Sequence, residues 1–204
     1  AVFEMTPQAA VVDRWFGRTV IRSDYRFDYE GAQRIIETEG KEPGDPAVSQ
    51  EIREAVLEFN RLASIMRKRR FSSGAISFER PEMKVEVDEK GKPVRVYEKI
   101  SKEANWLIEE FMLLANKSVA EFIATSGKMN GKEDKNAKTF VYRIHDEPNM
   151  EKIASLGKFV GNFGYKMGPV SSGRDVAKSL NSLLQESKDT PERDAFQMIA
   201  LRSM

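Results

Sequence analysis

The stretch KEANWLIEEFMLLANKSVAEFIA, residues 102–124, decides the fold class because its apolar residues predict one long helix. Leu107 and Phe111 follow one another at helical spacing, and Trp106 belongs to a second apolar stripe. Ser101 is the expected cap of this helix. A helix that is apolar nearly all round is expected to be buried nearly all round. We therefore expect a core built around this helix.

The same helix carries polar residues on one narrow face. Asn105, Glu109 and Asn116 lie at positions i, i+4 and i+11, which places them within about 40° of one another at about 100° per residue. A buried carboxylate flanked by two amides requires hydrogen-bond partners. Two interpretations follow from this. The face forms an internal hydrogen-bond network with a neighbouring loop, or it lines the channel of a ligand.

Outward from this helix, the hydrophobic periodicity alternates between that of helices and that of strands. Asp28, Asp45 and Thr190 are the expected N-caps of three further helices. The fold class is therefore α+β, with antiparallel strands and hairpins packed with several helices around one long buried helix. The hairpin is expected to have one solvent-exposed face, because its apolar residues alternate with charged ones. Strands are expected at 1–5, 15–22, 75–78 and 140–145, a hairpin at 83–97, a loop at 126–138, and helices at 29–39, 46–70, 150–159, 173–185 and from 191 onward.

The composition narrows the classes of function. The chain has 33 Lys+Arg against 32 Asp+Glu, so it lacks the strongly basic footprint of many nucleic-acid binders. It has no cysteine, which excludes disulfides, thiolate metal sites and a cysteine nucleophile. His145 is its one histidine, which excludes a multi-histidine metal site; we interpret it as a loop residue paired with a carboxylate. With no signal peptide and no apolar run near the roughly 20 residues that span a bilayer, we expect no membrane contact and a cytoplasmic location.

Few residues combine into a chemical site. Arg67–Arg70 are four consecutive cations, and two interpretations fit them: a phosphate-binding site or a solvated helix end. Phe78 also has two interpretations, a core residue or a base-stacking platform, and its periodicity favours the core. Asp24, Asp28 and Glu30 form a tight acidic group near a strand end, which suggests a Mg²⁺ site, but Asp28 and Glu30 are better explained as the cap and first turn of the next helix. With no nucleophile–base pair and no phosphate-binding glycine loop, we assign neither a catalytic residue nor a metal ligand to this chain.

Several segments together resemble the catalytic RNB domain of the ribonuclease R and ribonuclease II family of exoribonucleases. They follow the family's order over most of the chain, and GAISFE and RIHDEP are closer to ribonuclease R. The matching stretches are TVIRSDYRFDYEGAQRII (19–36), RRFSSGAISFERPEMKV (69–85), ANWLIEEFMLLANKSVAEFI (104–123), YRIHDEPNMEKI (142–153) and MIALRSM (198–204).

The resemblance implies that the parent protein hydrolyses single-stranded RNA from its 3′ end to nucleoside 5′-monophosphates, with Mg²⁺ as cofactor. The family's metal-binding aspartates precede the matched segment, and its arginine motif follows it. Residues 1–204 are therefore expected to be the central part of one RNB catalytic domain, truncated at both ends, and the fragment alone is expected to be inactive. The apolar stripe of the last helix, still running at Met204, agrees with a cut segment. No obligate protein partner is implied.

The resemblance also implies RNA-binding residues. Phe78 matches the phenylalanine that stacks on bases near the 3′ end, and Glu109 matches a glutamate of the helix that lines the RNA path. Asn105 shares the face of Glu109, and Arg70 is the cation of the basic run that we assign to a phosphate. The loop at 126–138 is longer than its family counterpart. The alternative function is a non-catalytic RNA-binding or protein-interaction module with a degenerate RNB core.

Overall fold

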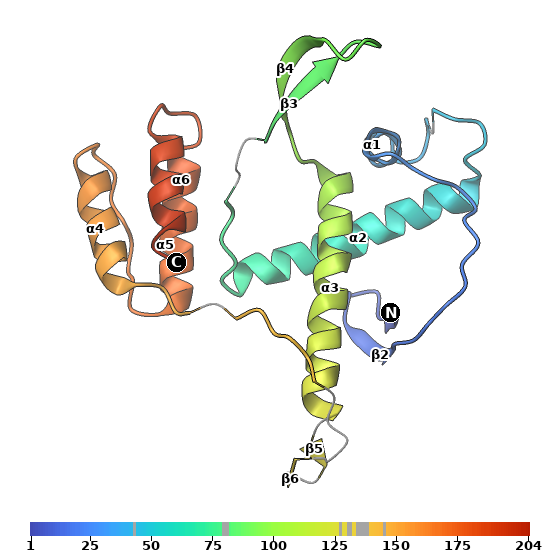
Figure 1. Ribbon diagram of the computed structural model, residues 1–204, viewed down its shortest axis with the longest axis horizontal. Coiled ribbons are helices and arrows are strands. Elements are labelled where there is room, and N and C mark those ends of the chain that lie inside the picture. Colours follow the sequence, from blue (N-terminus) through green and yellow to red (C-terminus); the bar gives the residue numbers. More distant parts are fainter. Residues whose placement is uncertain (43, 79–81, 127, 130–131, 134–138, 145) are drawn as a thin grey trace. The chain divides into compact units, whose positions relative to one another are not determined.

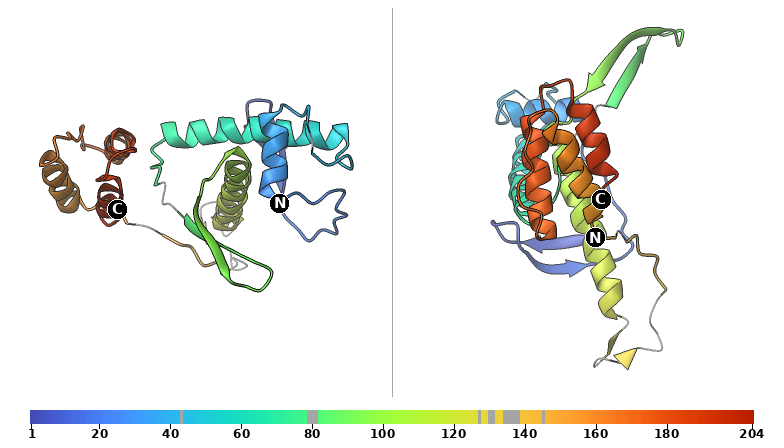
Figure 2. Two further views of the ribbon diagram at one scale, coloured as in Figure 1. Left: turned by 90° about the horizontal axis from the view of Figure 1, so that it is seen from above. Right: turned by 90° about the vertical axis from the view of Figure 1, so that its left-hand side faces the viewer.

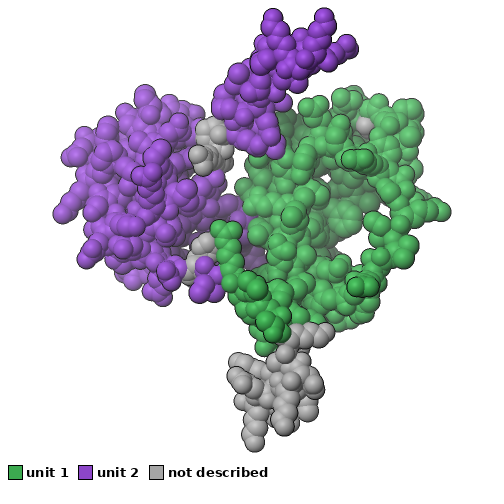
Figure 3. All heavy atoms as spheres, in the orientation of Figure 1, with its two compact units in different colours: residues 1–68, 101–143 green, residues 69–100, 144–204 purple. Residues whose placement is uncertain are grey.

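The computed structural model describes residues 1–42, 44–78, 82–126, 128–129, 132–133, 139–144 and 146–204 (Figure 1). These residues form two compact units, one made of 1–68 with 101–143 and the other of 69–100 with 144–204 (Figure 3). Within the described residues there are six helices and three antiparallel strand pairs. The expected mixture of helices and antiparallel hairpins is therefore confirmed.

Unit 1 contains one hairpin and three helices. Strands β1 (Val2–Met5) and β2 (Val11–Trp15) pair antiparallel, and the helices are α1 (Tyr29–Glu37), α2 (Gln50–Ser72) and α3 (Glu103–Ser126). Helix α2 crosses α3 in the view of Figure 1 and lies beside it when seen from above (Figure 2, left), and the rings of Phe59 and Phe111 meet edge to face at 5.5 Å between these helices. The last residues of α2, from 69 onward, belong to unit 2.

The second strand was expected at 15–22, but in the structure it lies at Val11–Trp15, so the prediction is wrong in its position. A tight turn, closed by the N–H of Thr6 donating to the carbonyl of Ala10 at 2.8 Å, pairs β2 with β1. This pairing takes up residues 11–15 and leaves the β-favouring residues after them without a neighbouring strand among the described residues. Val20 and Ile21 are consequently almost wholly exposed. A strand needs a partner, and propensity alone does not provide one.

Helix capping agrees with the sequence at α1 and differs at α2. The carboxylate of Asp28 accepts the N–H of Gly31 at 2.6 Å, as expected of an N-cap. Helix α2 begins at Gln50, four residues later than expected, and the hydroxyl of Ser49 accepts the N–H of Ile52 at 3.3 Å. Asp45 instead accepts the Tyr25 hydroxyl at 2.6 Å, so it joins two loops rather than capping the helix.

Helix α3 begins against α1 rather than on Ser101. The amide oxygen of Gln33 accepts the N–H of Ala104 at 2.9 Å, and its amide nitrogen donates to Glu103 at 2.7 Å. Gln33 is only 6% exposed, so this contact satisfies the first turn of α3 from another helix. The N–H of Lys102 is bonded to the Asn105 side chain at 3.1 Å.

The expectation that α3 is buried all round is wrong. Ile108, Met112, Leu113 and Phe122 are between 41% and 59% exposed. Within the described part of the chain α3 packs on α1, on α2 and on the segment around Phe16, whose ring lies 5.1 Å from that of Phe122. These neighbours cover part of the helix circumference, and apolar residues on the remaining part stay exposed.

Unit 2 is built around three helices: α4 (Met150–Gly161), α5 (Gly173–Glu186) and α6 (Arg193–Leu201). Asn149 and Ser172 cap α4 and α5 through their side chains. The ring of Phe196 is wholly buried and meets three aromatic rings edge-on at 5.1 to 6.1 Å. The buried cluster is Ile153, Leu156, Val160, Val176, Leu180, Leu183, Phe196 and Ala200.

The last helix starts differently from the sequence expectation. Helix α6 begins at Arg193 after Glu192, which makes no side-chain cap. The hydroxyl of Thr190, the expected cap, donates to the carbonyl of Ser187 at 3.0 Å. Thr190 therefore stabilises the turn that follows α5 instead of the first turn of α6.

The expected hairpin at 83–97 forms as β3 (Glu82–Val87) and β4 (Pro93–Lys99), in the register Val85↔Val96. Every residue of both strands is exposed, so both faces of the hairpin, and not one, are solvent-accessible in the described structure. One face carries ion pairs such as Arg95–Glu86 at 3.0 Å, and the other carries Val85 and its apolar neighbours.

Two further expectations concern residues 126–145. In the expected loop, β5 (Lys128–Met129) pairs with β6 (Lys132–Glu133), and most of the other residues lie outside the described part. Residues 139–144 form no strand, although the rings of Phe140 and Tyr142 meet at 5.0 Å as a shared face requires. His145 lies outside the described residues.

Candidate functional site

The four predicted RNA-binding residues fall into two groups. Asn105 and Glu109 lie on α3 in unit 1, and Arg70 and Phe78 lie in unit 2.

The polar face of α3 exists, but its carboxylate is not the buried one. The Glu109 side chain is 44% exposed, whereas that of Glu110 is only 3% exposed. The Asn105 side chain caps the start of its own helix, as described above, and Asn116 is exposed. The expectation of a buried Glu109 between two amides is therefore wrong, because the covered side of α3 lies one residue, or about 100°, further round the helix.

Arg67 explains why Glu110 is tolerated in a buried position. Its Nη1 atom lies 3.4 Å from a carboxylate oxygen of Glu109 and 3.7 Å from one of Glu110. Its guanidinium also lies 4.5 Å from the ring centre of Trp106, and the side chain is 21% exposed. The first cation of the basic run thus neutralises two carboxylates of α3. In the sequence, this ion-pair cluster was indicated only by two consecutive glutamates on one predicted helix and an arginine on another.

A second ion pair stabilises the start of α3. Lys102 lies 2.9 Å from Glu37 of α1. The hydrogen bond from Lys102 lowers the pKa of Glu37, and the same bond raises the pKa of Lys102. Both side chains are about half exposed, so water screens this pair and its contribution to stability is small.

Unit 1 also contains an apolar pocket of about 700 Å³. From α3 it is lined by Ala104, Leu107 and Ile108, which lie on a different side from Glu109. Phe59 of α2 and Tyr29 of α1 complete its wall, and both are about half exposed. This pocket offers aromatic and aliphatic contacts, with Arg26 and Asp28 at its margin.

In unit 2 the segment that follows α2 passes directly over α5. Gly74 has a φ of +109°, a conformation that favours glycine, and the turn it makes leads into residues 75–78. Phe78 is half-buried and packs against the aliphatic and aromatic cluster of the three helices. The ring is thus partly a core residue, as its periodicity indicates, and partly accessible, as a stacking platform requires.

The segment is bonded to α5 by one side chain. The amide oxygen of Asn181 accepts the N–H of Ser77 at 2.9 Å, and its amide nitrogen donates to the carbonyl of Ala75 at 2.8 Å. Asn181 was not among the residues predicted from the sequence. A polar residue in the middle of a helix, between Leu180 and the buried leucines that follow, was the available signal.

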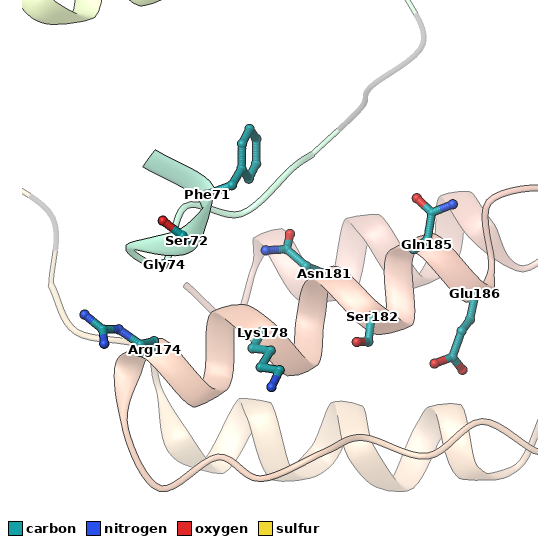
Figure 4. A pocket seen from close by; sticks show the side chains of 9 residues that line it. All are labelled: Phe71, Ser72, Gly74, Arg174, Lys178, Asn181, Ser182, Gln185 and Glu186. Atoms are coloured by element: carbon teal, nitrogen blue, oxygen red, sulfur yellow. The ribbon is translucent and has the colours of Figure 1, made fainter. Parts of the chain in front are cut away.

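A pocket of about 500 Å³ lies between α5 and the last residues of α2 with Gly74 (Figure 4). Figure 4 shows the Asn181 and Gln185 side chains on the side of α5 that faces the segment, whereas Lys178 points away from it. The lining residues are Phe71, Ser72, Gly74, Arg174, Lys178, Asn181, Ser182, Gln185 and Glu186. The guanidinium of Arg70 lies 5.0 Å from the centre of the Phe71 ring, so the predicted phosphate contact lies next to an aromatic wall of this pocket.

Among the described residues, no three histidine or acidic side chains are grouped so that they could hold a metal ion. Asp24 lies 3.5 Å from Arg22, and Asp28 caps α1. Nor is any helix in the described part of the chain long and apolar enough to cross a membrane.

Comparison with known proteins matches this chain to one family. A family model described as "RNB domain" matches residues 1–204. A DIS3-like exonuclease 2 of Caenorhabditis elegans is 35% identical over 182 residues, covering 84% of this chain and 20% of that protein. An Arabidopsis thaliana protein named "Inactive exonuclease DIS3L2" is 30% identical over 195 residues, covering 92% of this chain and 18% of that protein.

Solved structures give the same fold. The structure of Mycoplasma genitalium RNase R in complex with ribose methylated single-stranded RNA matches with a TM-score of 0.76 and 22% identity. The match covers 98% of this chain and 29% of that one. This chain therefore spans roughly a fifth to a third of the length of the proteins it matches.

Proposed function

This chain belongs to the RNB-domain exoribonuclease family, and on that premise we propose that it is the central part of an RNB catalytic domain. The parent protein degrades single-stranded RNA from the 3′ end to nucleoside 5′-monophosphates in the cytoplasm. The observation that carries the proposal is the match of the family model to residues 1–204. The fold agreement with RNase R, at a TM-score of 0.76, supports the same assignment.

We propose that this segment contributes part of the RNA channel. Phe78 offers a partly exposed ring for stacking, and Arg70 is a cation for a phosphate. Glu109 and Asn105 lie on one face of α3, where the 44% exposed carboxylate of Glu109 is accessible to the sugar hydroxyls of RNA.

The proposed cofactor of the parent is Mg²⁺, which supplies charge stabilisation and an activated water when bound. The acidic groups described here do not fit a Mg²⁺ site, because they cap helices or pair with cations rather than gather together. We therefore assign the metal ligands, like the catalytic residues, to other parts of the parent protein.

The first experiment compares the full-length parent with residues 1–204 alone. On uniformly labelled single-stranded RNA, the parent is expected to release labelled nucleoside 5′-monophosphates in a Mg²⁺-dependent reaction, and the fragment is expected to release none. Nucleotide release by the pure fragment, or inactivity of the parent, would contradict the proposal.

The second experiment tests Phe78 in the parent protein. Phe78→Ala removes a stacked base contact worth about 1–3 kcal/mol, which corresponds to roughly a 5- to 150-fold weaker hold on the RNA end. The expected result is a longer final product or slower digestion of short RNA. Phe140→Ala, a partly exposed ring of unit 1, is the matched control and is expected to leave the product length unchanged. Unchanged products for Phe78→Ala would remove it from the channel.

A second candidate function is a non-catalytic RNA-binding module with a degenerate RNB core. The observation that favours it is the Arabidopsis relative whose name describes it as inactive. It predicts that the parent binds single-stranded RNA with a salt-dependent affinity but releases no nucleotides. The nuclease assay of the full-length protein separates the two functions.

A further inference from the structure

We propose that Asn181 is a positioning residue that holds residues 75–78 on α5 and so determines where the Phe78 ring lies. This inference rests on the proposed function for its consequence, the contact between Phe78 and RNA. Its structural part, the hold on the segment, stands on contacts within unit 2 alone.

The two hydrogen bonds of Asn181 have the pattern of a backbone partner. Its amide group accepts the N–H of Ser77 and donates to the carbonyl of Ala75, two residues earlier. In an extended chain these two groups lie on the same edge, where a neighbouring strand would otherwise pair with them. One side-chain amide contains both the donor and the acceptor needed for that pairing.

The segment needs such a partner because it belongs to no strand in the described structure. Partly buried backbone N–H and carbonyl groups are costly when they are left unpaired. The turn at Gly74 already brings the chain close to α5, since a Cβ at that position would lie 3.8 Å from the Cα of Arg174. Gly74 thus sets the start of the segment, and Asn181 holds the residues that lead to Phe78.

The packing of Ile76 and Phe78 indicates what the two hydrogen bonds of Asn181 do. Ile76 and Phe78 both pack against the buried cluster of the three helices, and Asn181 bonds the residues on either side of Ile76. Fixing these two backbone groups fixes the direction of the chain as it reaches Phe78. A ring that stacks on a base requires such a fixed position, because a poorly placed contact group loses much of its effect.

The residue type at position 181 also indicates a tertiary role. Asparagine is among the poorer formers of helix interiors, and α5 continues past it to Glu186. Gln185, one turn further on and also on the wall of the pocket, is a better helix former and is exposed. Asn181 therefore offers no local advantage to α5, whereas its two bonds to the segment account for it.

The test uses the full-length protein with Asn181→Leu, Asn181→Asp and the control Gln185→Ala. Hydrogen exchange of the peptide that contains Ser77 reports the hold directly, without activity. Asn181→Leu removes both bonds at similar volume and is expected to accelerate exchange at Ser77 roughly fivefold. Gln185→Ala is expected to leave it unchanged. Unchanged exchange in Asn181→Leu would overturn the proposal.

The length of the final RNA product tests the positioning of Phe78. Asn181→Leu is expected to reproduce the longer product of Phe78→Ala, and to lengthen it no further when the two substitutions are combined. Asn181→Asp retains the acceptor for Ser77 but loses the donor to Ala75, so a smaller shift is expected. This variant also serves if Asn181→Leu does not fold.

The outcomes separate this inference from the proposed function. A wild-type product from Asn181→Leu, together with a longer product from Phe78→Ala, would overturn the positioning role. If the final RNA product is unchanged in Phe78→Ala itself, the proposed RNA contact of Phe78 is refuted. The hydrogen-exchange measurement would then still test whether Asn181 fixes residues 75–78 on α5. A lower melting temperature with no change in product length would mark Asn181 as purely structural.

Discussion

Exchanging the carboxylate of Glu110 for an amide tests the most unexpected feature of unit 1, its buried acidic residue. Glu110→Gln keeps the shape of the side chain and removes its charge, while Arg67 remains at 3.7 Å. Glu109→Gln is the matched control, because it makes the same chemical change on the neighbouring residue, where the side chain is 44% exposed. The two variants differ in burial and share one arginine.

The expected magnitude follows from these contacts. Removing one partner of a fully buried ion pair costs about 3–5 kcal/mol. Here Glu109 remains 3.4 Å from the same nitrogen of Arg67, so the cation keeps a partner and the cost is smaller. We expect Glu110→Gln to lower the free energy of unfolding by about 2 kcal/mol, which is below that range. For Glu109→Gln we expect at most about 1 kcal/mol.

Thermal unfolding followed by circular dichroism measures the difference. For a folded segment of 204 residues, 1 kcal/mol shifts the melting temperature by about 2–4 °C, so Glu110→Gln is expected to lower it by about 4–8 °C. The double variant leaves Arg67 without either carboxylate and is expected to lose more than the sum of the single losses. A larger loss from Glu109→Gln than from Glu110→Gln would refute the assignment of Glu110 as the buried partner of Arg67.

Three further predictions follow from other elements. Phe196→Ala is expected to cost about 3–5 kcal/mol in urea unfolding, because the ring is wholly buried among three aromatic side chains; a loss under about 1 kcal/mol would contradict this packing. Val85→Thr on the exposed hairpin is expected to change the unfolding free energy by less than about 0.5 kcal/mol, and a large loss would mean that another part of the protein covers this face. The hydrogen bond from the Tyr25 hydroxyl lowers the pKa of Asp45, so its stabilising effect is present above about pH 4 and is lost as the pH falls through the folded pKa of Asp45. The same bond raises the pKa of Tyr25, so the bond persists above about pH 10 and is lost as the pH rises through the folded pKa of Tyr25. Tyr25→Phe is expected to be less stable than the wild type at pH 7, and the difference is expected to shrink as the pH falls through the folded pKa of Asp45; a difference that is independent of pH in acid would argue against the bond.

The candidate site was partly predictable. Phe78 was assigned to base stacking by the family resemblance and Arg70 to a phosphate by the run of cations, and the contact of either residue with RNA stays a prediction. Asn181 was missed, since a polar residue in the middle of a helix does not identify its partner, which is 104 residues away in the sequence. Glu109 was taken for the buried carboxylate because helical spacing groups it with Asn105. Which side of α3 is covered depends on Arg67 and α2, and spacing within α3 does not report it.

By itself, the sequence determined the helices and the hairpin. These elements depend on short-range features such as the Asp28 cap, the turn glycines and the apolar period, which act between residues a few positions apart. The tertiary structure alone decided that Gln33 completes the first turn of α3, that 15–22 has no strand partner and that Glu110 rather than Glu109 is buried. The physical reason is that partners and burial are properties of neighbours in space. The sequence of a long apolar helix predicts that other elements pack against it, but it does not determine which side of the helix they bury.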